Sequence, residues 1–184
     1  LHVNNKSAFQ RATDFLLDLG HRQIGLINGL EMQDFAFRRR EGYVAALKSR
    51  GLDLDPTLMR SDEMTEVYGY ESAKKMLQSD APPSAFLVAS MISAYGIRRA
   101  IQEAGLVMGS DVSVVTFDDD LSYLSNRQDI PIFTACRSSV RDAGMRVAEM
   151  LLRQIKAPQS PLEQTLLEAE LIAGRSTGPF TGQI

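Results

Sequence analysis

Residues 112–120 read Val112-Ser113-Val114-Val115-Thr116-Phe117-Asp118-Asp119-Asp120, a mostly apolar run of strand length that ends in carboxylates. A second run of this kind, Ala85-Phe86-Leu87-Val88-Ala89, precedes it in the chain and ends at Ser90. Near-continuous apolar strands are typical of a parallel sheet that is covered by helices on both faces. The two segments therefore predict the centre of such a sheet.

Helices and strands alternate through the rest of the sequence. Apolar residues at helical spacing predict helices over 7–19, 37–50, 67–77, 92–104 and 140–155, and short apolar runs predict further strands over 23–27, 57–60, 133–136 and 166–173. The residues before the first helix, at 1–4, are expected to be the end of a strand. This alternation predicts an α/β fold with a doubly wound parallel sheet.

The composition narrows the class of function. The chain of 184 residues carries a formal net charge of -3, which argues against a surface built to bind nucleic-acid phosphates. Its single cysteine, Cys136, has no partner for an internal disulfide and is expected to be a small buried filler in a cytoplasmic protein. No apolar run is long enough for a membrane span, and no residue pattern predicts a metal or a cofactor.

Polar residues follow most of the predicted strands. In open parallel sheets ligands bind beyond the carboxyl ends of the strands, so these positions are candidates for a binding site. Their carboxylates and hydroxyls, together with Arg38-Arg39-Arg40 in the second helix, suit a sugar, which needs a carboxylate, an arginine fork and an apolar side chain against its ring. Loops after strands are polar in most α/β proteins, so the pattern alone leaves a specific site open.

Several motifs in order resemble the lactose repressor (LacI/GalR) family over residues 4–179. They are Asn4-Asn5, Asp18-Leu19-Gly20-His21-Arg22-Gln23-Ile24, Arg39-Arg40-Glu41-Gly42-Tyr43, Asp111 to Asp119, Phe133-Thr134-Ala135-Cys136-Arg137-Ser138-Ser139 and Arg175-Ser176-Thr177. The resemblance implies the effector-sensing region of a transcriptional regulator, with a fold similar to periplasmic sugar-binding proteins of type I. It implies no enzymatic activity.

The resemblance also implies two lobes joined by three crossings, near Gly20-His21, Cys136-Arg137-Ser138 and 164–166. Residues 1–20 and 139–163 would form part of an N-terminal lobe, and residues 21–138 and 164–184 a C-terminal effector-binding lobe. The N-terminal lobe would be incomplete, and the helix-turn-helix head that binds operator DNA would be absent from this chain.

By the same matching, Arg39 and Asp118 stand at positions that anchor the sugar in the family. Ser90, Phe35, Met64 and Ser138 are further candidates, and they depart from the family's usual residues. Ser90 replaces an asparagine, Met64 an aromatic residue and Ser138 a frequent glutamine, while Phe35 replaces a small hydroxyl residue. Ring stacking is therefore expected from Phe35 or Phe37, and the smaller serines favour a glycoside or oligosaccharide.

Two other classes of function stay open. The run Asp118-Asp119-Asp120 after a strand resembles the first motif of haloacid-dehalogenase-type phosphatases, in which Asp118 and Asp120 would act beside magnesium. A transport-type sugar-binding protein would share the fold. For the regulator, Tyr123, Leu124 and the helix from Ile92 resemble family subunit contacts and favour a homodimer.

Overall fold

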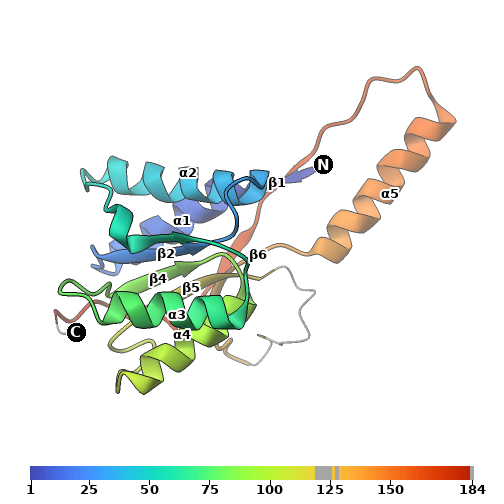
Figure 1. Cartoon of the computed structure of the whole chain (residues 1–184). Helices are drawn as coiled ribbons and strands as arrows, with labels where there is room; N and C mark the ends of the chain where they lie inside the picture. Colours follow the sequence, from blue (N-terminus) through green and yellow to red (C-terminus); the bar gives the residue numbers. More distant parts are fainter. Residues whose placement is uncertain (119–125, 127–128, 183–184) are drawn as a thin grey trace.

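The chain forms a central sheet with a pair of helices on each face (Figure 1). The computed structural model describes residues 1–118, 126 and 129–182. Within these residues the main sheet has six strands in the order β3-β2-β4-β5-β6-β8, of which the first five are parallel and β8 is antiparallel to β6. The strands are β2 (Ile24–Asn28), β3 (Met59–Ser61), β4 (Ala85–Val88), β5 (Ser113–Asp118), β6 (Thr134–Arg137) and β8 (Glu170–Ile172).

Helices α1 and α2 cover one face of the sheet, and α3 and α4 cover the other (Figure 1). They span α1 (Asn5–Asp18), α2 (Asp34–Ser49), α3 (Glu66–Leu77) and α4 (Met91–Glu103). A short 3-10 helix, Pro56–Leu58, leads into β3. This arrangement confirms the predicted α/β fold with a doubly wound parallel sheet.

Alternate residues of each central strand enter two separate cores. Leu26, Leu87 and Val115 pack with α1 and α2, whereas Phe86 and Val114 pack with α3 and α4. Because every residue of β4 and β5 is buried, both faces of these strands require apolar side chains. The continuous apolar runs of the sequence follow from this two-sided burial.

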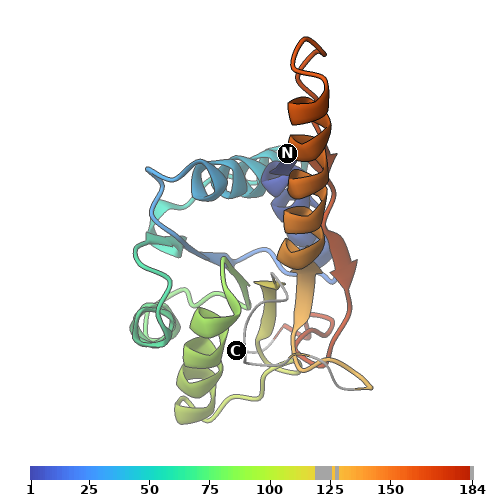
Figure 2. The ribbon, with the colours of Figure 1, turned by 90° about the vertical axis from the view of Figure 1, so that its right-hand side faces the viewer.

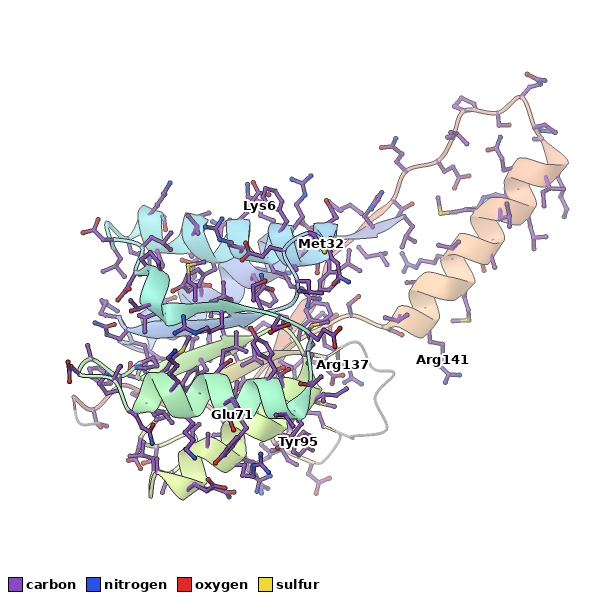
Figure 3. The ribbon with its side chains drawn as sticks, viewed as in Figure 1. Lys6, Met32, Glu71, Tyr95, Arg137 and Arg141 are labelled. Atoms are coloured by element: carbon purple, nitrogen blue, oxygen red, sulfur yellow. The ribbon has the colours of Figure 1, made fainter. Side chains whose placement is uncertain are left out.

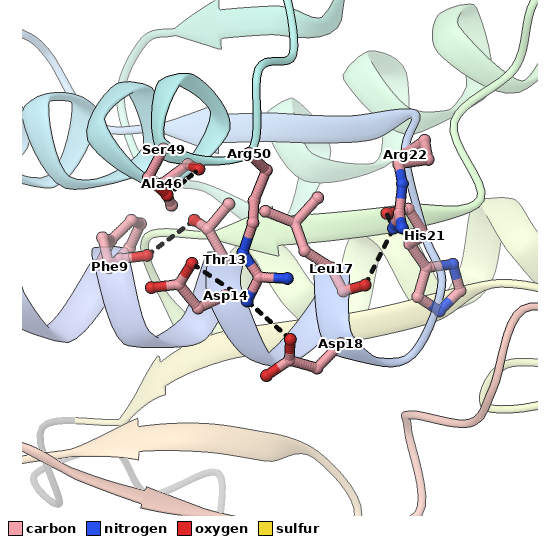
Figure 4. A network of polar contacts seen from close by, with 10 residues as sticks. All are labelled: Phe9, Thr13, Asp14, Leu17, Asp18, His21, Arg22, Ala46, Ser49 and Arg50. Carbon is pink, nitrogen blue, oxygen red and sulfur yellow. Dashed lines mark hydrogen bonds and ion pairs between the residues drawn. The ribbon is translucent and has the colours of Figure 1, made fainter.

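Helix α1 belongs to the same body as the main sheet. Its residues Ala8, Phe9 and Leu16 lie in the core that contains the sheet residues facing α2. Arg50, at the C-terminal end of α2, lies 2.7 Å from Asp18 and 3.9 Å from Asp14 of α1, and these ion pairs link the two helices (Figure 4). A lobe boundary at residue 20 would divide one hydrophobic core. We therefore propose that the boundary lies before Asn5.

Helix α5 (Val140–Lys156) stands away from this body (Figures 1 and 2). None of its residues is buried, and its exposed apolar side chains are Val140, Met145, Val147, Leu151, Leu152 and Ile155. The two-stranded sheet of β1 (His2–Val3) and β7 (Leu166–Leu167) also lies outside the main sheet. Of these segments, β1 and α5 fall within the residues predicted for the N-terminal lobe, whereas β7 falls within the range 164–184 predicted for the C-terminal lobe.

The predicted strand over 166–173 is two strands in two sheets. β7 pairs with β1 in parallel, and β8 pairs with β6 in antiparallel orientation. Between them, Glu168 accepts a hydrogen bond from Asn4 at 2.6 Å, and Ala169 is buried against the main core. The chain thus passes from the small sheet to the main one within residues 168–169.

Cys136 is buried on β6, where its thiol donates to the carbonyl of Ala8 at 3.2 Å. Burial raises the pKa of this thiol to about 12, so it is an inert filler, as predicted. Across the described residues, no helix combines the length and the apolar character that a membrane span requires.

Candidate functional site

The carboxyl ends of the parallel strands meet at one edge of the sheet. Asn28 pairs in register with Ser61, and Asp118 pairs with Arg137. In Figure 3, Arg137 and Met32 both lie on the side of the body from which the chain runs to α5. We call this the carboxyl edge; it faces the segments outside the main sheet.

Arg39 is a buried charged residue near this edge. Only 6% of it is exposed, although it carries a guanidinium group. Its Nε donates to Asn5 Oδ1 at 2.9 Å, and its Nη1 donates to the carbonyl of Ala89, just after β4, at 2.7 Å. The Phe117 ring centre lies 3.9 Å from its Cζ. A buried guanidinium held in one orientation is suited to bind an oxygen-rich ligand, because little further ordering is needed.

Three aromatic rings surround the Arg39 guanidinium. Besides Phe117, the ring centres of Phe35 and Phe9 lie 4.9 and 5.1 Å from Cζ. Because ring faces attract cations, this arrangement stabilises the charge in a largely apolar setting. The sequence does not predict Phe117 as a site residue, because it is an apolar member of a predicted strand.

Asp118 and Ser138 lie together at the ends of β5 and β6. Asp118 is 5% exposed and Ser138 is 6% exposed. The backbone N–H of Ser138 donates to the Asp118 carbonyl at 3.1 Å. The structure thus brings these two predicted residues to the edge that carries Arg39.

Phe35 and Met64 meet around Gly29, the residue after β2. A Cβ placed on Gly29 would lie 3.3 Å from the Met64 sulfur and 3.4 Å from the Phe35 ring. Glycine at this position therefore leaves room for both side chains. Phe37 differs, because it is 44% exposed and its ring centre lies 5.8 Å from Cζ of the exposed Arg38.

Ser90 has a structural role at the start of α4. Its hydroxyl oxygen accepts a hydrogen bond from the Ser93 N–H at 3.2 Å, and its hydroxyl lies 3.2 Å from that of Ser93. This is the N-cap interaction that satisfies a free donor of the first helical turn. A polar residue after a strand can cap a helix, bind a ligand or do both, and the sequence does not distinguish these roles.

Asn28, which ends β2, and Asn5 also lie near this edge, although neither is among the predicted ligand-binding residues. Asn28 is fully buried, and its Nδ2 donates to the Ala36 carbonyl at 2.9 Å, which holds the start of α2 near the carboxyl edge. Its Oδ1 is the one buried side-chain nitrogen or oxygen in the described part of the chain that has no hydrogen-bond partner. Asn28 is recognisable in the sequence as a turn residue, whereas Asn5 resembles an ordinary helix start.

His21 lies at the opposite edge, where the strands begin. Its ring nitrogens lie 2.9 Å from the hydroxyls of Ser84 and Ser113, and Nε2 lies 3.1 Å from the Gly178 carbonyl. This buried residue joins the starts of β4 and β5 to the C-terminal segment. His21 is therefore a structural residue of the main body, in keeping with our proposal that the lobe boundary lies before Asn5.

The pH dependence of stability should report on this histidine. Burial lowers the pKa of His21, with a smaller contribution from the Arg22 charge and an opposing one from the Gly178 carbonyl. The unfolded chain, in which histidine titrates near pH 6.5, therefore takes up the proton first as the pH falls. The contribution of His21 to the free energy of unfolding is therefore complete above pH 6.5. It is lost as the pH drops below this value, by at most about 1.4 kcal/mol per pH unit.

Urea unfolding between pH 5 and 8 measures this effect. We expect the pH dependence of the unfolding free energy to be smaller in His21→Gln than in the wild type, and the difference between the two proteins isolates His21 from the carboxylates. If the free energy of unfolding changed equally with pH in both proteins, the pKa of His21 would not change on folding.

Comparison with known proteins identifies the fold and the family. The family model for the periplasmic binding protein-like domain matches residues 13–177. The chain belongs to this family. Among curated proteins, the HTH-type transcriptional regulator AglR of Rhizobium meliloti is 44% identical over 96% of this chain, and the repressor CytR of Escherichia coli is 28% identical over 96%.

Solved structures of regulators have the same fold. A putative transcriptional regulator from Yersinia pestis superposes with a TM-score of 0.86 at 26% identity, over 98% of this chain and 64% of its own. The regulator CelR in complex with cellobiose superposes with a TM-score of 0.84 at 25% identity, over 95% of this chain and 52% of its own. The resemblance to LacI-type regulators is thereby confirmed.

The chain spans about half the length of the curated relatives that it matches, 50% of AglR and 51% of CytR. Two predictions fall on residues outside the described part of the chain. These are the Asp120 carboxylate of the phosphatase alternative and the subunit contacts at Tyr123 and Leu124.

Proposed function

We propose that this chain is the sensing part of a LacI-type regulator that binds a sugar or glycoside between two lobes. In this proposal, Arg39 and Asp118 bind ligand oxygens, and Phe35 and Met64 lie against the sugar ring. Ser138 lines the crossing between the lobes, and Ser90 adds a hydroxyl at the edge. No cofactor or metal takes part.

One observation carries this proposal: a buried arginine is held at the carboxyl edge by Asn5 and by the Ala89 carbonyl, with aromatic rings around it. Burying a guanidinium is costly unless its donors are satisfied and its charge is stabilised. A protein that needed Arg39 only for packing would be served as well by an apolar side chain. The retained charge favours a role in binding.

The relatives support the class of ligand and the purpose of binding. CelR, which shares the fold at 25% identity, forms a complex with cellobiose, and AglR and CytR are named as HTH-type regulators. By analogy, ligand binding here would change the relative position of the two lobes. That change would alter the binding of a helix-turn-helix head to operator DNA, in a cytoplasmic homodimer. The ligand shifts this equilibrium by its difference in affinity for the two states.

A thermal-shift screen of the intact protein tests the proposal. We expect at least one saccharide from a panel of cellobiose, maltose, sucrose, trehalose, glucose and ribose to raise the Tm in proportion to the logarithm of its concentration. A flat response to the whole panel would contradict sugar sensing and favour a nucleobase or a phosphorylated effector.

No observation favours the two other classes of function. The curated relatives reported above are transcriptional regulators rather than phosphatases or transport proteins. The regulator is therefore the function that the site supports best.

A further inference from the structure

Asn5 occupies the junction between the two parts of the chain. It is the first residue of α1, which packs in the main core, and it comes two residues after Val3, the end of β1. β1 is paired with β7 and lies outside the main sheet. A movement of the small sheet relative to the main body would therefore pass through the backbone next to Asn5.

The side chain of Asn5 bonds to both parts at once. Its Nδ2 donates to the carbonyl of Val3 at 3.2 Å, and its Oδ1 accepts from Nε of Arg39 at 2.9 Å. An amide is suited to this task because it carries a donor and an acceptor in one rigid plane. If the Val3 carbonyl moves and the Asn5 side-chain amide rotates with it, the Asn5 oxygen that orients Arg39 is displaced as well.

We propose that Asn5 is a positioning residue that links the orientation of Arg39 to the position of β1. The inference rests on the proposed function, since it connects Arg39 of that site, through hydrogen bonds of Asn5, to the proposed lobe boundary before Asn5. Ligand oxygens that accept from the guanidinium strengthen the orientation that Asn5 and Ala89 already give it, and they restrain the Asn5 amide and, through it, the Val3 carbonyl. The link is reciprocal, so a change in the position of β1 alters the affinity for the ligand.

The neighbouring Asn4 provides a matched control. Its Oδ1 accepts from the Ser7 N–H at 3.2 Å as the N-cap of α1, and its Nδ2 donates to Glu168 at 2.6 Å. Asn4 therefore stabilises the same helical turn, and no hydrogen bond from its side chain to Arg39 is among the described contacts. Asn4→Ala should lower stability while leaving ligand affinity nearly unchanged.

The test is isothermal titration calorimetry on the intact protein. The ligand is the saccharide of the panel that raises the Tm of the wild type most, and cellobiose is the first member of the panel to be screened. We expect Asn5→Ala to weaken binding by about tenfold to a hundredfold, since a hydrogen bond that orients a charged group is lost. The double variant Asn5→Ala/Arg39→Ala should bind no more weakly than Arg39→Ala alone, because Asn5 acts through Arg39.

A second variant separates the two bonds. Asn5→Asp keeps the acceptor for Arg39 and loses the donor to Val3, so it should bind within a few-fold of the wild type. In small-angle X-ray scattering, however, the change in radius of gyration on adding the saccharide should be smaller for Asn5→Asp than for the wild type.

The outcomes distinguish the two claims. If the wild type binds a saccharide and Asn5→Ala binds it equally well, the role of Asn5 is refuted and the proposed function stands. If Asn4→Ala and Asn5→Ala weaken binding to the same extent, Asn5 is only a helix-start residue. If the wild type binds no saccharide of the panel, the proposed function fails, and the inference about Asn5 fails with it.

Discussion

Replacing Arg39 by alanine is expected to weaken saccharide binding by the intact protein by about thirtyfold or more, since truncating one partner of a buried charged hydrogen-bond pair costs about 2–5 kcal/mol. The loss has two physical sources. The guanidinium no longer donates to the ligand, and the Asn5 and Ala89 oxygens that it orders lose their donor. Isothermal titration calorimetry measures the affinity. Arg39→Lys should recover little of it, because an ammonium cannot donate from a planar fork.

Arg38 is the matched control for this substitution. It is exposed on the same helix and pairs with Asp34 at 3.3 Å and with Glu41 at 3.1 Å. Such exposed ion pairs contribute little to stability. Arg38→Ala should therefore bind the saccharide like the wild type. An Arg39→Ala protein that is folded and binds with unchanged affinity would show that the site is elsewhere.

Replacing Gly96 by alanine is expected to lower the free energy of unfolding by about 1–3 kcal/mol, although alanine normally favours a helix over glycine by about 1 kcal/mol. A Cβ on Gly96 would collide with the Glu66 carbonyl oxygen and lie 2.7 Å from the Tyr70 nitrogen. Both atoms belong to the backbone of α3. Because that backbone cannot move without opening the packing of the two helices, the substitution forces α3 and α4 apart. Urea unfolding of the 184-residue chain measures the change.

Gly144, within α5, provides the control for this effect. An added Cβ there would have no neighbour within 4 Å, and no residue of α5 is buried. Gly144→Ala should leave the cooperative transition of the main body unchanged. If Gly96→Ala were as stable as Gly144→Ala, the close approach of α3 and α4 would not exist in solution.

The strands that are buried on both faces were the most predictable part of the fold. The runs at 85–89 and 112–117 correspond to β4 and β5 within one residue, because two-sided burial leaves no position for a polar side chain except small ones such as Ser113 and Thr116. The segment 166–173 was less predictable. Its apolar residues serve two sheets, and hydrophobicity does not show where the chain leaves one sheet for the other.

The lobe to which a helix belongs could not be predicted from its own pattern. The apolar stripe of α1 shows that one face is covered, but it does not show by which element. Only the shared core with Leu26 and Leu87 places α1 on the main sheet. The apolar residues of α5 also predict a covered face, whereas in the described chain they are exposed.

The polar residues of the site were predictable only as a group. Strand ends at one edge indicate where a ligand would bind, and Asp118 and Ser138 are among the polar residues there. Only the resemblance to the family singled these two out. Reasoning from strand ends cannot separate Ser90, which caps α4, from a ligand contact. It also misses Asn5 and Phe117, because their contacts with Arg39 connect segments that are far apart in the sequence.

A crystal structure of the intact protein with the saccharide that stabilises it would locate the binding site directly. We expect saccharide oxygens within about 3.2 Å of both the Arg39 guanidinium and the Asp118 carboxylate, with the Phe35 ring against the sugar. A saccharide bound elsewhere, with no hydrogen bond to Arg39 or Asp118, would contradict it.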